Sequence, residues 1–182
     1  FSSDNGGSLR HGANNGPFRG GKGDHFEGGI RVPMVASWRG HIEAGSSSDN
    51  IGLLMDLFPT FCEIAGLPQP TYVEAPRLPV NDEDARSLGH ERVLTEWDSV
   101  LFGKIVGLRT ICRDGWVATA CLPGSLHNGT EGELYNLAND PLQQINLWDD
   151  SAYRSTRDDL LADMWDSLPT PDAVRRECDA PV

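Results

Sequence analysis

The sequence has no apolar run that approaches 18 residues, which excludes a helix that spans a membrane. Basic residues are scarce, because 15 Lys and Arg stand against 27 Asp and Glu and give a formal net charge of −12. Nucleic-acid phosphates repel such a chain, so we expect no nucleic-acid partner. The 4 cysteines form no C-x-x-C pair and no zinc-ligand spacing, which argues against a zinc or dithiol site.

What the sequence does contain fits a packed protein. Hydrophobic residues make up 38% and 20 glycines add to the apolar share, so a buried core can form. The 182 residues suffice for one large domain or two small ones. Prolines and acidic residues cluster between residues 68 and 90, where we place a boundary. The expected organisation is a first part over 1–70, a linker over 71–87 and a small α+β part over 88–182.

The first part contains few regular elements. Residues 6–29 are rich in Gly and Asn and indicate a long loop, and loops of that length are usually functional or disordered. Residues 30–38 are expected to form a strand. A helix is expected over 53–66, because Pro59 suits its first turn and Gly66 its C-terminal cap.

The second part alternates strands and turns before a final helix. We expect a strand over 92–100, a hairpin over 108–121 that turns at Asp114-Gly115, and a short strand near 132. A helix is expected from about 151 to 168, capped by Asp150 or Ser151. One face of that helix is apolar and consists of Tyr153, Leu160, Leu161, Met164 and Leu168.

Residues with chemical potential gather in the first loop. Asp4 and Asn5 offer two side-chain oxygens, the ligand type that suits Ca²⁺ at ~2.3–2.6 Å. Lys22 follows between Gly21 and Gly23, where the backbone can approach a ligand closely. A lysine in this setting can act as a point charge for a phosphate or sulfate oxygen. Residues 1–41 hold five basic side chains against three acidic ones, which favours an anionic ligand.

The same loop contains a pattern found in nucleotide-binding loops. Residues 16–22 fit G-x-x-x-x-G-K, but Gly23 occupies the place of the Ser or Thr that binds Mg²⁺. No apolar strand leads into Gly16, and the residues after Lys22 are a poor helix start. We therefore do not interpret this match as a nucleotide site.

Five segments, taken in order, resemble the type I sulfatase family, the arylsulfatase-like branch of the alkaline-phosphatase superfamily. Residues 3–7 match its S-D-N-G-G, 15–22 its N-x-P-L-R-G-G-K, and 26–33 its W-E-G-G-x-R-V-P. Residues 55–67 resemble its D-L-x-P-T helix, and 132–148 its E-L-Y-D-L-x-N-D-P segment. The resemblance implies an α/β fold: the end of an alkaline-phosphatase-like mixed sheet from the catalytic domain, then a small C-terminal antiparallel sheet with a packed helix.

The resemblance also implies roles for single residues. Asp4 and Asn5 would be ligands of the active-site cation, Ca²⁺ or alternatively Mg²⁺. Lys22 would be catalytic, binding the sulfate and stabilising charge on the leaving oxygen. His25, next to the expected sulfate pocket, is either a substrate contact or a solvent-facing loop residue. Three further matches are interpreted as residues that shape the loop through ion pairing, namely Arg19, Glu27 and Arg31.

The family's nucleophile is a formylglycine made from Cys or Ser in C-x-P-S-R, and this motif has no counterpart here. Cys121 begins a C-x-P, but Ser125 stands where Arg is required, so we interpret it as a chance match. The chain thus resembles the C-terminal part of a sulfatase, which hydrolyses sulfate esters. Its expected partners are an upstream part that carries the formylglycine and a sulfated small molecule or carbohydrate.

Two alternatives to this function stay open. One is a phosphonate or phosphate monoester hydrolase of the same superfamily, and the other is an inactive remnant that binds sulfated glycans. The family's compartments are periplasmic, secreted or lysosome-like, and the sequence does not choose among them. Asn128-Gly129-Thr130 fits the acceptor pattern for N-linked glycosylation in a protein of the eukaryotic secretory pathway.

Overall fold

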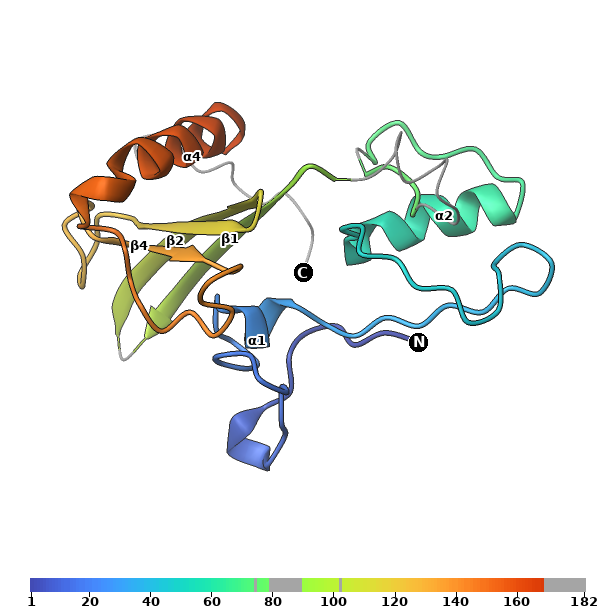
Figure 1. The fold of residues 1–182 in the computed structure, drawn as a ribbon. Coiled ribbons are helices and arrows are strands. Elements are labelled where there is room, and N and C mark those ends of the chain that lie inside the picture. Colours follow the sequence, from blue (N-terminus) through green and yellow to red (C-terminus); the bar gives the residue numbers. More distant parts are fainter. Residues whose placement is uncertain (74, 79–89, 102, 169–182) are drawn as a thin grey trace. The chain divides into compact units, whose positions relative to one another are not determined.

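The chain forms two compact units, Phe1–Val93 and Leu94–Val182, in a computed structural model that describes residues 1–73, 75–78, 90–101 and 103–168 (Figure 1). The predicted division into 1–70, 71–87 and 88–182 stays a prediction, and most of the proposed linker lies outside the described residues. Within the described residues, no helix is long and apolar enough to cross a membrane.

The first unit is built mainly of loops with short helices. Its elements are the 3₁₀ turn η1 (Leu9–His11), the helix α1 (Glu27–Ile30), the 3₁₀ turn η2 (Leu54–Asp56) and the helix α2 (Leu57–Ile64). Figure 1 shows the segment 1–30 as a long looped excursion with α1 at its end. The prediction of a long loop over 6–29 is confirmed apart from the two short helical turns.

The strand expected over 30–38 is wrong. Ser2 and Met34 form a single antiparallel bridge, flanked by a bond from the Val35 amide to the Phe1 carbonyl at 2.8 Å. A strand needs a partner of similar length, and within the described residues only the first two of the chain pair with this segment. Pro33 also lacks the amide hydrogen that a ladder requires.

The helix expected over 53–66 is confirmed, with its regular part shorter than predicted. Asp56 stands at its N-cap position, and Pro59 lies in the first turn, where a missing amide hydrogen costs nothing. Gly66 follows the C-cap with a φ of 67°, the left-handed conformation that ends many helices.

The second unit is a four-stranded sheet in the order β1-β2-β3-β4, comprising β1 (Arg92–Leu101), β2 (Lys104–Arg113), β3 (Trp116–Cys121) and β4 (Gly132–Asn136). β2 pairs antiparallel with β3, and β3 with β4. The turn between β2 and β3 is Asp114-Gly115, as predicted, and both residues have positive φ values, of 52° and 74°. Such values are those of the tight hairpin turn that Asp-Gly favours.

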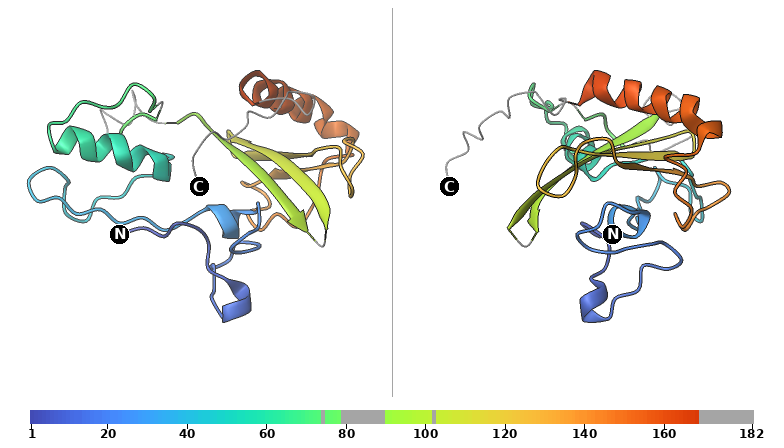
Figure 2. Two further views of the ribbon diagram at one scale, coloured as in Figure 1. Left: turned by 180° about the vertical axis from the view of Figure 1, so that it is seen from behind. Right: turned by 90° about the vertical axis from the view of Figure 1, so that its left-hand side faces the viewer.

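One face of this sheet is covered by α4 (Arg154–Ser167), which follows the turn η3 (Ser151–Tyr153) (Figure 2). Asp150 caps the turn, because its carboxylate accepts a bond from the Ala152 amide at 2.9 Å. Leu160 and Met164 are buried against a row of sheet residues, Ile111, Ala118 and Leu134. The predicted helix, its cap and its apolar face are confirmed.

Candidate active site

Asn15 closes the first loop through its side chain. Its Oδ1 accepts a bond from the Gly7 amide at 2.6 Å, and its Nδ2 donates to the Gly7 carbonyl at 3.0 Å. The same Nδ2 also donates to the Gly20 carbonyl at 3.0 Å. One carboxamide therefore ties the segment that follows the Asp4-Asn5 pair to the segment that precedes Lys22.

Lys22 is held by its backbone and presents its side chain to solvent. Its amide donates to the Gly7 carbonyl at 3.1 Å, and it lies in a turn closed by a bond from the Asp24 amide to the Gly21 carbonyl at 2.9 Å. The Asp24 carboxylate accepts from the Gly21 amide at 2.8 Å and closes the turn a second time. Gly23, with a φ of 93°, occupies the turn position that disfavours residues with a side chain. The exposed ammonium has no polar partner among the described residues.

Asp4 and Asn5 are fixed by backbone contacts on either side. The Ser3 hydroxyl donates to the Asn5 carbonyl at 2.7 Å, and the Gly6 amide donates to the Gly29 carbonyl at 2.8 Å. At Gly6 the two segments cross so closely that a Cβ there would lie 1.8 Å from the Gly28 oxygen. The Asp4 side chain is exposed, and within the described residues neither Asp4 nor Asn5 has a side-chain partner.

Of the residues interpreted as shaping the loop, Glu27 and Arg31 form the expected ion pair, and Arg19 makes a cation–π contact. Glu27 is 7% exposed and forms an ion pair with Arg31, from Oε2 to Nη1, at 3.3 Å. The Arg19 guanidinium lies 3.8 Å from the centre of the Phe26 ring. These contacts stiffen the segment that turns back toward Gly6.

His25 is half-buried and packs on the same aromatic residue. Its ring centre lies 4.1 Å from that of Phe26, with the planes tilted by 37°. This packing fixes the imidazole three residues after Lys22 in the chain. Its role as a substrate contact stays a prediction.

The cation that the family resemblance implies would find a partial ligand set. A carboxylate and a carboxamide are hard oxygen donors of the kind that Ca²⁺ and Mg²⁺ prefer. Ca²⁺ takes six to eight such ligands, and among the described residues no three His, Cys, Asp or Glu side chains gather in one place. The two donors fit the cation in kind but do not complete its shell.

Cys121, the chance C-x-P match, lies in an environment that disfavours the reactive thiolate. It ends β3, and burial raises the pKa of its thiol to about 11, with smaller contributions from the Glu133 and Glu131 carboxylates. A nucleophilic cysteine needs a lowered pKa, because the thiolate is the reactive form.

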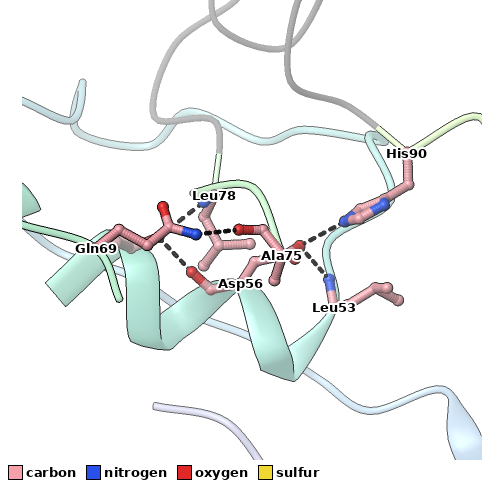
Figure 3. A network of polar contacts seen from close by, with 7 residues as sticks. Leu53, Asp56, Gln69, Ala75, Leu78 and His90 are labelled. Atoms are coloured by element: carbon pink, nitrogen blue, oxygen red, sulfur yellow. Dashed lines mark hydrogen bonds and ion pairs between the residues drawn. The ribbon is translucent and has the colours of Figure 1, made fainter. Parts of the chain in front are cut away.

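Sequence reasoning missed a buried polar network around Asp56, which is 1% exposed (Figure 3). Its Oδ2 accepts bonds from the Leu53 amide and from Nε2 of His90, both at 2.8 Å. The Thr60 hydroxyl donates to the Asp56 carbonyl at 2.6 Å and accepts from the Leu78 amide at 2.7 Å. The available signal was the acidic residue directly before an apolar helix, the usual place of an N-cap.

Comparison with known proteins places these features in context. The sequence model of the sulfatase family matches residues 1–67. The rat N-acetylgalactosamine-6-sulfatase is 49% identical over 75 residues, which cover 39% of this chain and 14% of that enzyme. The human steryl-sulfatase is 47% identical over 60 residues, 33% of this chain and 10% of that enzyme. The chain thus spans about a seventh or less of the length of these curated relatives.

Solved structures extend the likeness in three dimensions. A Bacteroides thetaiotaomicron protein assigned to the sulfatases matches 77% of this chain and 30% of its own, with a TM-score of 0.59 and 25% identity. A second structure, solved in complex with its substrate D-glucosamine-2-N,6-O-disulfate, matches 81% of this chain and 31% of its own, with a TM-score of 0.66. At 16% identity this second match shows the fold alone.

Proposed function

Because the chain belongs to the sulfatase family through its first 67 residues, we propose that it forms the C-terminal part of an enzyme that hydrolyses sulfate esters. It would supply two cation ligands, Asp4 and Asn5, and one sulfate-binding residue, Lys22. An upstream part would supply the formylglycine nucleophile and the remaining ligands.

The observation that carries the proposal is the shared anchor of these residues. Gly7 comes two residues after Asn5, and its carbonyl accepts the Lys22 amide at 3.1 Å. The Asn15 carboxamide bonds the same glycine on both of its backbone groups. A single hydrogen-bonded assembly therefore fixes both proposed elements, and fixed geometry is what charge stabilisation in catalysis requires.

Lys22 is suited to the charge changes of S–O cleavage. When the ester bond breaks, negative charge grows on the leaving oxygen while the sulfuryl group keeps its own charge. An ammonium held beside these oxygens stabilises the transition state more than the ground state, and this difference accelerates the reaction. Lys22 is free to take this role because the described part of the chain offers its side chain no polar partner.

Asp4 and Asn5 would hold the cation against the sulfate. The bound cation would act as a Lewis acid on a sulfate oxygen. The exposed Asp4 carboxylate contributes a negative charge and the carboxamide a neutral oxygen, so this half of the site would carry one net negative charge toward the metal.

The apolar surface around α2 would be available for contact with an upstream part. Five apolar side chains around this helix are about half exposed, at 40 to 60%: Leu54, Met55, Phe58, Phe61 and Ile64. Exposed apolar clusters of this kind usually mark a face that another part of a protein covers.

For the substrate we propose a sulfated carbohydrate. The N-acetylgalactosamine-6-sulfatase of rat is 49% identical over 75 residues, whereas the steryl-sulfatases of human and mouse are 47% identical over 60 residues and 40% identical over 85 residues. The excess of basic side chains in residues 1–41 suits a ligand that carries more than one anionic group.

The test is turnover by the full-length protein, produced together with a formylglycine-generating enzyme. We expect release of sulfate from an aryl sulfate and from sulfated N-acetylhexosamines, with loss of both activities in Lys22→Ala. Faster turnover of aryl phosphate than of aryl sulfate would instead favour the phosphate monoester alternative. No turnover of either ester, by protein shown to carry formylglycine, would favour the inactive remnant.

A further inference from the structure

The loop between β3 and β4 carries Asn128-Gly129-Thr130, which the proposed hydrolase function leaves without a role. All three residues are exposed. In the 182 residues this is the one Asn followed two positions later by Ser or Thr without an intervening Pro. The pattern alone is common by chance, so the local structure decides its value.

Two hydrogen bonds from Thr130 polarise the side-chain amide of Asn128. Its Oδ1 accepts bonds from the Thr130 amide at 2.8 Å and from the Thr130 hydroxyl at 2.7 Å. Both bonds lie within three consecutive residues, so the turn can form in a nascent chain before the sheet assembles. Within the described residues Nδ2 has no hydrogen-bond acceptor, which leaves this nitrogen available.

The folded protein keeps the loop in an outward conformation. The Glu131 carboxylate accepts from the Asn128 amide at 3.0 Å and from the Gly129 amide at 3.1 Å. Trp148, which is buried in the core of the second unit, donates through Nε1 to the Thr130 carbonyl at 3.1 Å. A group attached to Asn128 would therefore extend into solvent without displacing core residues.

We propose that Asn128 is the acceptor of an N-linked oligosaccharide, transferred from a lipid-pyrophosphate donor. Nδ2 of Asn128 forms a bond to C1 of the first sugar, and the bond from C1 to the pyrophosphate oxygen breaks. The lipid pyrophosphate leaves with the bonding electron pair, and the proton lost from Nδ2 passes to a base of the transferase. The Thr130 amide and hydroxyl, which both donate to Oδ1, draw electron density from the Asn128 carboxamide and make the Nδ2 proton easier to remove.

The Thr130 hydroxyl distinguishes Asn128, as a glycan acceptor, from an ordinary exposed asparagine. Serine at position 130 keeps a hydroxyl that can donate to Oδ1 of Asn128, whereas valine has nearly the shape of threonine but lacks the hydroxyl. Asn139 is a matched control, because it is also exposed in a turn but lies outside any acceptor pattern.

The experiment translates the whole 182-residue chain, fused to a cleavable signal peptide, in an extract with endoplasmic-reticulum microsomes. Protection from added protease identifies the translocated chains. We expect one glycan per translocated chain, seen as a single mobility shift that an N-glycan-specific amidase reverses. The shift should vanish in Asn128→Gln and Thr130→Val and persist in Thr130→Ser and Asn139→Gln.

Because transfer acts on nascent chains, a variant that folds poorly still reports on the acceptor. Translocated chains without the shift would overturn the proposal, as would a shift that survives Asn128→Gln. The result does not depend on sulfate ester hydrolysis, so the two proposals succeed or fail separately.

Discussion

The Asn15 side chain and the Gly7 backbone form a reciprocal pair of hydrogen bonds: Oδ1 accepts from the Gly7 amide at 2.6 Å, and Nδ2 donates to the Gly7 carbonyl at 3.0 Å. The carboxamide thus pairs with Gly7 as the backbone of a neighbouring strand would. The Gly7 carbonyl that accepts from Asn15 is also the acceptor for the Lys22 amide. The positions of the proposed cation ligands and of the proposed sulfate-binding lysine therefore depend on one residue that has no chemical role itself.

Asn15→Asp should lower both stability and activity. The substitution keeps an acceptor for the Gly7 amide but removes both donors and turns a carboxylate oxygen toward the Gly7 and Gly20 carbonyls. Two lost bonds, together with this repulsion, should cost about 2 kcal/mol in the free energy of unfolding. Urea denaturation of the full-length protein measures it. Asn14→Asp is the control, since among the described residues that exposed side chain only accepts from the Gly16 amide. An equal loss of stability there would show that the bonds of Asn15 to Gly7 and Gly20 have no special weight.

Asp4→Ala should produce a defect that added cation repairs. Removing this carboxylate takes one negative charge from the proposed cation shell and weakens affinity for Ca²⁺. The full-length enzyme should lose activity at low Ca²⁺ and regain part of it as Ca²⁺ is raised. Asp24→Ala removes the carboxylate that closes the Lys22 turn, so it should lower activity without changing the Ca²⁺ dependence. Unchanged Ca²⁺ dependence in Asp4→Ala would show that the Asp4-Asn5 pair is only a turn.

Lys22→Ala should differ in kind, with a defect that Ca²⁺ does not repair. Losing a charged donor to the reacting group costs on the order of 10²–10³ in rate, or about 2.7–4 kcal/mol. Lys22→Arg should recover little of it, because a planar guanidinium does not replace a compact ammonium in this tight turn. The measurements are kcat and KM across a Ca²⁺ titration. Wild-type kcat/KM in Lys22→Ala would remove this residue from the site.

Cys121 gives a prediction about pH. Its pKa is raised to about 11 by burial, so the folded protein holds the proton in a range where an unfolded thiol loses it. The stabilisation is therefore complete at neutral pH and decreases as pH rises from about 9 toward 11. In a variant with Cys62, Cys112 and Cys178 replaced by Ser, iodoacetamide at pH 8 should alkylate the folded protein about 100-fold more slowly than the denatured protein. Equal rates would contradict the raised pKa.

The parts of the fold that sequence predicted well depend on local rules. The Asp114-Gly115 turn, the cap at Asp150 and the apolar face of α4 are each set by neighbouring residues, so spacing and residue type suffice. The strand expected over 30–38 failed because strand formation depends on a partner, which the local sequence does not specify.

The candidate site was located by motif, whereas its supports were not. Asn15 was noticed only as part of a family pattern, since nothing in its sequence context shows that it bonds to Gly7 and Gly20. The contact between Asp56 and His90 joins residues 34 positions apart, and a long-range pair of this kind has no local signature.

That pair supports a last prediction about stability. Asp56→Ala leaves the Leu53 amide and the His90 ring nitrogen without their hydrogen-bond acceptor at a buried position. This loss should cost about 3 kcal/mol in the free energy of unfolding. Asp56→Asn should cost less, because its oxygen still accepts from the Leu53 amide. A double-mutant cycle with His90→Ala isolates the pair, and we expect a coupling energy of about 1–2 kcal/mol. Strictly additive losses would show that the Asp56 carboxylate acts only through the Leu53 amide and that His90 contributes nothing through it.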